Sequence, residues 1–147
     1  MKRVIFVGIH NKPGLPPLCS STRTGKVIDQ IAMNVSPECQ RANLFPVNYL
    51  PHDLEERERF IDQFEIDENA VYVGLGKIVC DALHRMDVPL LAVHHPGHIL
   101  RIGKVQEYVT HVVDRIHEMQ SPRHFFCEED WNGKNICKVQ CLNCKRI

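Results

Sequence analysis

The chain has 147 residues, of which 44% are hydrophobic and 24% charged, a composition typical of one globular domain that buries a core without disulfides or metals. Its formal net charge is zero, so composition alone does not indicate a nucleic-acid-binding protein, and no apolar run is long enough to span a membrane. The first apolar run stops at Gly8, too early for a signal peptide, and we therefore expect an intracellular, cytoplasmic protein.

Short apolar runs alternate with segments of helical periodicity along the first 120 residues. Strands are predicted at residues 3–8, 42–45, 70–74 and 90–93. Helices are predicted at residues 22–33, 54–64, 77–86 and 104–119. This alternation indicates an α/β fold, a three-layer α/β/α sandwich around a four-stranded parallel sheet. We expect residues 1–120 to form this domain and residues 121–147 to form a Cys-rich C-terminal extension.

Charge is distributed unevenly along the chain. Eight acidic residues and only two basic ones, Arg57 and Arg59, lie between residues 53 and 68, so the remainder is net basic. Two interpretations remain open: a solvated acidic helix with scattered cations elsewhere, or a mildly basic surface that faces phosphates.

Residues 88–101, with the sequence VPLLAVHHPGHILR, form the most informative stretch. An apolar strand breaks there into His-His-Pro-Gly-His, and a helical pattern follows. Because α/β proteins bind ligands at the carboxyl ends of parallel strands, this turn is a candidate site. We interpret His95 as functional, the alternative being a turn histidine hydrogen-bonded to the backbone, and we interpret His94 and His98 as structural or solvent-facing.

Two nucleotide-binding motifs are incomplete. The Thr-Gly-Lys sequence at 24–26 is followed by Val27, where a phosphate loop carries the Ser or Thr that binds magnesium. The Gly-Leu-Gly sequence at 74–76 lacks the third glycine of a dinucleotide-binding turn. A tight turn between strand and helix explains the second sequence equally well.

The seven cysteines do not indicate a disulfide framework in an intracellular chain. Four of them crowd the C-terminal extension: Cys127, Cys137, Cys141 and Cys144. Their spacing is compatible with a structural zinc site, with His124 as an alternate ligand, or with reduced thiols that bind no metal.

Four segments, in order, resemble motifs of the uracil-DNA glycosylase superfamily. Residues 8–14 (GIHNKPG) resemble its Gly-x-x-Pro-Gly loop with two residues inserted, and residues 20–29 (SSTRTGKVID) resemble the opening of its first long helix. Residues 42–45 (ANLF) are similar to its Asn-bearing strand, and residues 92–101 (AVHHPGHILR) resemble its His-Pro-Ser motif. The resemblance is greatest to small glycosylase-like proteins of phages and bacteria.

The resemblance implies an enzyme that flips a base out of DNA and hydrolyses its N-glycosidic bond. It implies that His95 stabilises the departing base anion and that Asn11, or His10, positions the attacking water. The residues implied in base binding are Gly8, Asn43 and Phe45. The residues implied in binding DNA phosphates are Ser21, Thr22, Arg23, Thr24, Arg101 and Lys104. We expect a monomer that acts on DNA in a bacterium or a phage-infected host cell and needs no cofactor for its chemistry.

Three departures from the superfamily support other hypotheses. Ile9 or His10 stands where several branches carry Glu or Asp, the first loop lacks a stacking aromatic, and the four-cysteine iron–sulfur pattern is absent. Asn43 could also cap a strand end, and Asn11 could be an ordinary turn residue. A non-catalytic nucleic-acid-binding module therefore remains an alternative, as does a nucleotide- or nucleoside-processing enzyme that uses residues 74–76 and the His cluster.

Overall fold

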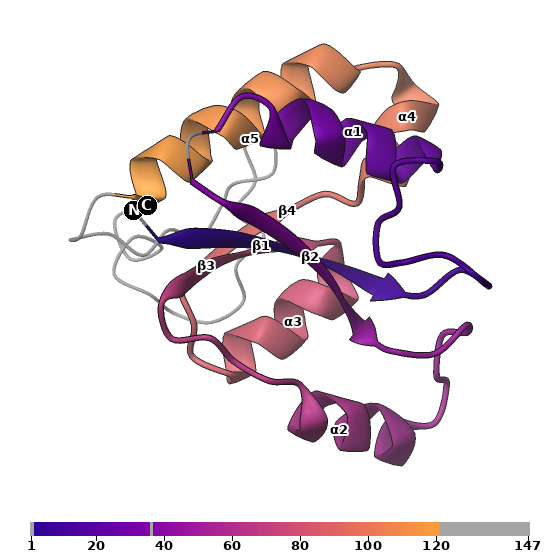
Figure 1. Cartoon of the computed structure of the whole chain (residues 1–147). Helices are drawn as coiled ribbons and strands as arrows, with labels where there is room; N and C mark the ends of the chain where they lie inside the picture. The colour runs from indigo at the N-terminus through magenta and orange to yellow at the C-terminus, as the bar shows by residue number, and fades with distance from the viewer. Residues whose placement is uncertain (1, 36, 121–147) are drawn as a thin grey trace.

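In the computed structural model, which describes residues 2–35 and 37–120, four parallel strands form one sheet with helices on both faces (Figure 1). The strands are β1 (Arg3–His10), β2 (Cys39–Phe45), β3 (Ala70–Leu75) and β4 (Leu90–Val93). The helices are α1 (Arg23–Ala32), α2 (Leu54–Gln63), α3 (Lys77–Arg85), α4 (Pro96–Ile102) and α5 (Val105–Met119). The predicted α/β class with a four-stranded parallel sheet is confirmed. The predicted Cys-rich extension at 121–147 lies outside the described residues.

The strand order β2-β1-β3-β4 creates a switch in chain direction beside β1. From β1 the chain passes through α1 to β2 at one edge, then returns through α2 to β3 on the other side of β1. Loops that leave the carboxyl ends of two such strands diverge, because their helices pack on opposite faces of the sheet. The order therefore leaves a crevice at the carboxyl end of β1.

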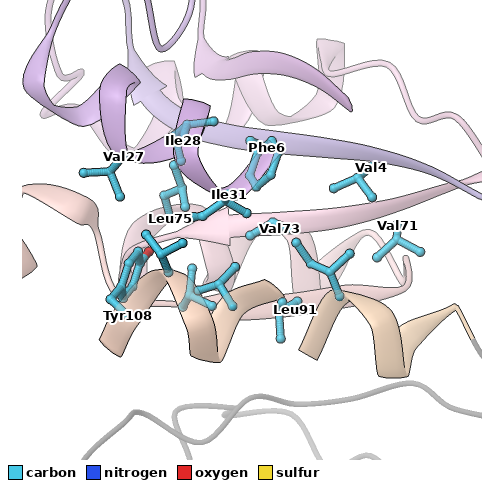
Figure 2. Close-up of a cluster of buried hydrophobic side chains, with 14 of the residues drawn as sticks. Val4, Phe6, Val27, Ile28, Ile31, Val71, Val73, Leu75, Leu91 and Tyr108 are labelled. Atoms are coloured by element: carbon cyan, nitrogen blue, oxygen red, sulfur yellow. The ribbon is translucent and has the colours of Figure 1, made fainter. Parts of the chain in front are cut away.

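Side chains that alternate along the strands belong to two hydrophobic cores, one on each face of the sheet. On β1, Val4 and Phe6 point to the face covered by α1, α4 and α5, which Figure 2 shows in close-up. Ile5 and Val7 point to the opposite face, which α2 and α3 cover. Strands buried on both faces read as continuous apolar runs rather than as alternating ones, which explains the runs in the sequence. Each such buried side chain contributes roughly 1.5–3 kcal/mol.

The helix after β4 differs from the prediction, because the structure has two helices where one was expected. The predicted helix at 104–119 is α5, and the shorter α4 precedes it. Pro96 occupies the first turn of α4, and Gly103 ends the helix in the left-handed conformation with a φ of 71°. No helix in the described part of the chain has the length and apolar character needed to cross a membrane.

The acidic segment forms α2, which lies on the outside of the molecule. Asp53 caps its first turn by accepting a hydrogen bond from the N–H of Glu55, and acidic residues there interact favourably with the helix dipole. None of its side chains is fully buried, although Phe60 and Ile61 pack against the sheet. The acidic charge is therefore concentrated on the α2 and α3 side of the sheet.

We expect the substitution Gly25→Ala to destabilise the protein because a Cβ at this position in α1 would lie 1.8 Å from the carbonyl oxygen of Cys19. The overlap should lower the free energy of unfolding by about 1–3 kcal/mol, despite the better helix propensity of alanine. Urea denaturation measures the change. The control Lys26→Ala alters an exposed neighbour and should change stability by less than about 0.5 kcal/mol. Equal stability of the two variants would contradict the prediction.

Candidate functional site

A pocket of about 230 Å³ lies at the carboxyl end of β1, beside the switch in strand order. It combines the loop after β1, the start of α1, the end of β2 and the turn after β4. Its lining residues are Gly8, Ile9, His10, Lys12, Leu15, Pro16, Leu18, Cys19, Thr22, Thr24, Asn43 and His95. The structure thus brings together residues from four separate segments that the sequence marked as candidates.

Two asparagine side chains meet where β1 and β2 end. Asn43 pairs with Gly8 in the register of the two strands, and its Nδ2 donates a 2.5 Å hydrogen bond to Oδ1 of Asn11. A Cβ at Gly8 would lie 2.7 Å from Oδ1 of Asn43, so a larger residue there would displace this amide. Asn43 lines the pocket, whereas Asn11 does not, and the backbone N–H of Asn11 donates to the carbonyl of Val47.

His95 caps α4 with its own ring. Its Nδ1 accepts a 3.0 Å hydrogen bond from the N–H of Gly97, and its backbone is extended, as the residue before a proline requires. An acceptor at Nδ1 leaves the proton of the neutral imidazole on Nε2. The sequence Pro-Gly after His95 therefore creates a histidine whose tautomer is fixed by the helix that it caps.

The surroundings of His95 disfavour its charged form. Burial is the main cause that lowers the pKa of His95, followed by the positive charges of Arg101 and Lys12. Both cations are themselves exposed. The pocket therefore holds a neutral hydrogen-bond donor beside two cations, an arrangement suited to a ligand that carries or develops negative charge.

Arg41 and Asp29 form an ion pair, here called the clamp, that holds Leu18 in the pocket wall. Arg41 of β2 donates to the carbonyl of Leu18 over 2.6 Å and pairs with the carboxylate of Asp29 on α1, which also accepts from Ser20. The hydrogen bond from Arg41 is the main cause that lowers the pKa of Asp29. Leu18 has a φ of 50°, which is unusual for a residue other than glycine, and its side chain approaches Gly8. The clamp thus stabilises a strained residue of the pocket wall.

The start of α1 forms another part of the wall. Thr22 caps the helix: its hydroxyl accepts from the N–H of Gly25 and donates to the carbonyl of Cys19. Thr22 and Thr24 line the pocket, whereas Ser21 and Arg23 are exposed beside it. The hydroxyl of Ser21 is the main cause that lowers the pKa of Cys19. The backbone N–H of Thr22 also donates to the carbonyl of Cys19, so both donors of Thr22 are used to hold the start of α1 rather than offered to the pocket.

Phe45 does not belong to the pocket. Its ring is fully buried in the core under α2 and packs edge-on against Phe60, with ring centroids 5.8 Å apart. A base in the pocket cannot stack on it in this arrangement. Among the candidates for phosphate contact, Arg101 on α4 and Lys104 just before α5 are exposed and do not line the pocket.

Sequence analysis did not select Lys12, Leu15 or Leu18 as candidate pocket residues. The Pro- and Gly-rich composition of residues 9–21 predicted a loop at this position. Contacts with β2 and α1 determine which residues of this loop face the pocket. The most important is the hydrogen bond from Arg41 to the carbonyl of Leu18. The only sequence signal for Lys12 was its place after a strand that ends at the candidate site.

The Gly-Leu-Gly sequence serves packing rather than the pocket. A Cβ at Gly74 would lie 2.9 Å from the sulfur of Cys80, so glycine lets α3 pack closely against β3. Gly76 begins α3 with a φ of 92°, a conformation that other residues rarely adopt. Neither glycine lines the pocket.

No group of three or more potential metal ligands is clustered within residues 2–35 and 37–120. The cysteines described there are free thiols: Cys19, Cys39 and Cys80. The predicted zinc ligands lie outside the described residues: Cys127, Cys137, Cys141 and Cys144.

We expect His95 to titrate below the usual pH of a histidine, and the substitutions Lys12→Met and Arg101→Met each to raise its pKa by removing a nearby cation. NMR titration of the ring protons measures these shifts. The unfolded chain takes up this proton at higher pH than the folded chain, so the contribution of His95 to stability is lost as the pH falls below about 6.5.

The matched control is Arg85→Met, which removes a cation that pairs with Glu58 on the α2 and α3 side of the sheet. Its titration of His95 should equal that of the wild type. A His95 that titrates at or above the usual pH would contradict the electrostatic interpretation of the pocket.

No protein-family model, curated protein or solved structure matches this chain. What the pocket can do chemically therefore follows from its own residues.

Proposed function

We propose that this protein is a DNA N-glycosylase that hydrolyses the bond between deoxyribose and a flipped uracil or damaged base, and that it is related to the uracil-DNA glycosylase superfamily. The observation that carries the proposal is that His95, which caps α4 through Nδ1, lines the same pocket as Asn43. Cleavage of an N-glycosidic bond leaves negative charge on the departing base and positive charge on the sugar. The enzyme must stabilise that anion.

His95 is suited to stabilise the departing base. A neutral imidazole with its proton on Nε2 can donate to a carbonyl oxygen that gains charge in the transition state, and the lowered pKa favours this neutral form. The positive charges of Lys12 and Arg101 add to the stabilisation without a proton transfer. Removing one preorganised donor of this kind from an enzyme typically costs about 3–4 kcal/mol in the barrier.

Asn43 is suited to bind the edge of a base. One N–H of its amide donates to Asn11, which leaves a second N–H and the carbonyl oxygen for other partners. A pyrimidine edge with one acceptor and one donor fits that pair. The bond to Asn11 restrains the amide, so the base meets a preorganised group. In this scheme Asn11 restrains Asn43, and His10, which lines the pocket, becomes a stronger candidate for contact with water.

DNA is the proposed partner because cations and backbone N–H groups surround the pocket. Arg23 is exposed between Thr22 and Thr24 of the pocket wall, where α1 begins, and the exposed Arg101 lies close enough to His95 to lower its pKa. Lys104 is exposed just before α5. Helix N-termini and Lys or Arg side chains are the usual phosphate contacts in protein–DNA complexes. We further propose that the protein acts as a monomer in the cytoplasm and needs no cofactor for catalysis. Zinc, if residues 121–147 bind it rather than holding reduced thiols, would have a structural role only.

A second candidate function is a non-catalytic module that binds a flipped or single-stranded base. It is favoured by one observation: within the described part of the chain, neither a carboxylate nor a Phe, Tyr or Trp lines the pocket. A glycosylase without a carboxylate depends on anion stabilisation and on water held by amides and backbone, which predicts a slow enzyme.

The test is alkali-induced strand cleavage of oligonucleotides that carry one uracil, one hypoxanthine or one mismatch. We expect the wild type to produce abasic sites and His95→Ala to do so at least about a hundredfold more slowly, because the anion loses its donor. The control His98→Ala removes an exposed histidine from the same helix and should retain wild-type activity.

Two results would overturn the proposal. Absence of cleavage on every substrate, with salt-sensitive DNA binding intact, would favour the binding module. Absence of both cleavage and DNA binding would contradict both functions.

A further inference from the structure

Tyr108 connects the core of the protein to the turn that carries His95. It belongs to α5 and lies fully buried between that helix and the sheet, as Figure 2 shows. Its hydroxyl donates a 2.6 Å hydrogen bond to the backbone carbonyl of His94, the residue immediately before His95. A helix that supplies no residue to the pocket lining is thus bonded directly to the turn that presents the imidazole.

The hydroxyl of Tyr108 is not needed to fill the core, because phenylalanine has nearly the same shape without a polar atom. A buried hydroxyl is tolerated only where it finds a partner, and here the partner is a single backbone carbonyl. Burial raises the pKa of Tyr108 far above its usual value, so the hydroxyl stays protonated and remains a donor. The hydroxyl can therefore donate to the carbonyl of His94 at neutral pH.

The carbonyl of His94 and the N–H of His95 belong to one planar peptide group. Holding that carbonyl fixes the plane from which the side chain of His95 departs. A second bond, from the N–H of Gly97 to Nδ1, fixes the rotation of the ring. The two bonds together restrain the imidazole at both its backbone and its ring.

We propose that Tyr108 is a positioning residue for His95: its hydroxyl holds the peptide between residues 94 and 95 so that the imidazole presents Nε2–H to the pocket. Tyr108 acts through His95 and does not touch the substrate. The restraint on His95 is a property of the folded protein, whereas its effect on a reaction rate rests on the proposed glycosylase function.

Tyr72 offers a matched control. It is buried in the other core, and its hydroxyl accepts a 2.8 Å hydrogen bond from the N–H of Asp67, just before β3 begins. Both tyrosines are buried, and each bonds to the backbone through its hydroxyl. Tyr72 does so at the amino end of the strands, away from the pocket. Tyr72→Phe therefore removes the same atom and leaves the turn at His95 intact.

The first experiment compares the NMR titration of His95 in the full-length wild type, Tyr108→Phe and Tyr72→Phe, with thermal unfolding to compare their stabilities. We expect Tyr108→Phe to raise the pKa of His95 toward the usual value, because a loosened turn admits water to a ring whose pKa burial lowers. Tyr72→Phe should leave the titration unchanged. Identical titrations of His95 in the two variants would overturn the proposal.

The second experiment compares rates of abasic-site formation with saturating DNA. We expect Tyr108→Phe to lower the maximal rate by about ten- to a hundredfold with little change in DNA affinity, as misplacement of a catalytic group does. Tyr72→Phe should keep the wild-type rate. A slower Tyr108→Phe with an unchanged His95 titration would overturn the proposal. If the wild type forms no abasic sites, the glycosylase function fails, and the titration alone decides the role of Tyr108.

Discussion

The central strand β1 is the constraint on which the rest of the structure depends. It pairs with β2 on one side and β3 on the other, and its side chains feed both hydrophobic cores. The backbone groups of a central strand must find other partners where the strand ends, and just after β1 the N–H of Asn11 donates to the carbonyl of Val47. The pocket lies at that end because the chain after β1 turns toward α1 on one face of the sheet. The chain after β2 and after β3 turns toward α2 and α3 on the other face.

The imidazole of His95 has a structural role as the cap of α4 and, under the proposed function, a chemical role in the pocket. The helix that begins after it requires an acceptor for a free N–H, and the ring supplies one through Nδ1. The same bond determines which nitrogen carries the proton. A serine or aspartate would cap α4 equally well but would offer the pocket no N–H donor. A single hydrogen bond of His95 thus both stabilises the start of α4 and leaves an N–H donor for the pocket.

Much of the fold follows from local sequence, because apolar runs and helical periodicity are properties of neighbouring residues. The strand β4 has its predicted bounds, and α1 lies within one residue of its predicted bounds at each end. The short α4 was missed as a separate helix because seven residues carry too little periodicity, although Pro96 and Gly103 bound it. The order of the strands depends on contacts between distant segments and was not predicted.

The candidate site was predictable in part, because some of its residues lie at the ends of strands that local sequence predicts. His95 and Asn43 follow or end strands, so their position at the carboxyl edge follows from a parallel sheet. Phe45 is at the end of the edge strand β2, where Leu44 and Phe45 are both buried. The alternation of buried and exposed residues therefore does not predict which of the two faces the core and which faces the pocket. The inward turn of Leu18 depends on an arginine more than twenty residues away.

The acidic α2 has a consequence for how the molecule would approach a polyanion. Its negative charge lies on one side of the sheet, whereas Lys12 and Arg101 lie close enough to His95 to lower its pKa, so the described part of the chain separates charges of opposite sign. A uniform attraction pulls a protein toward DNA in any orientation, but a dipole exerts a torque and rotates it. If DNA is the partner, as proposed, this separation of charge would turn the pocket toward the phosphates before contact is made.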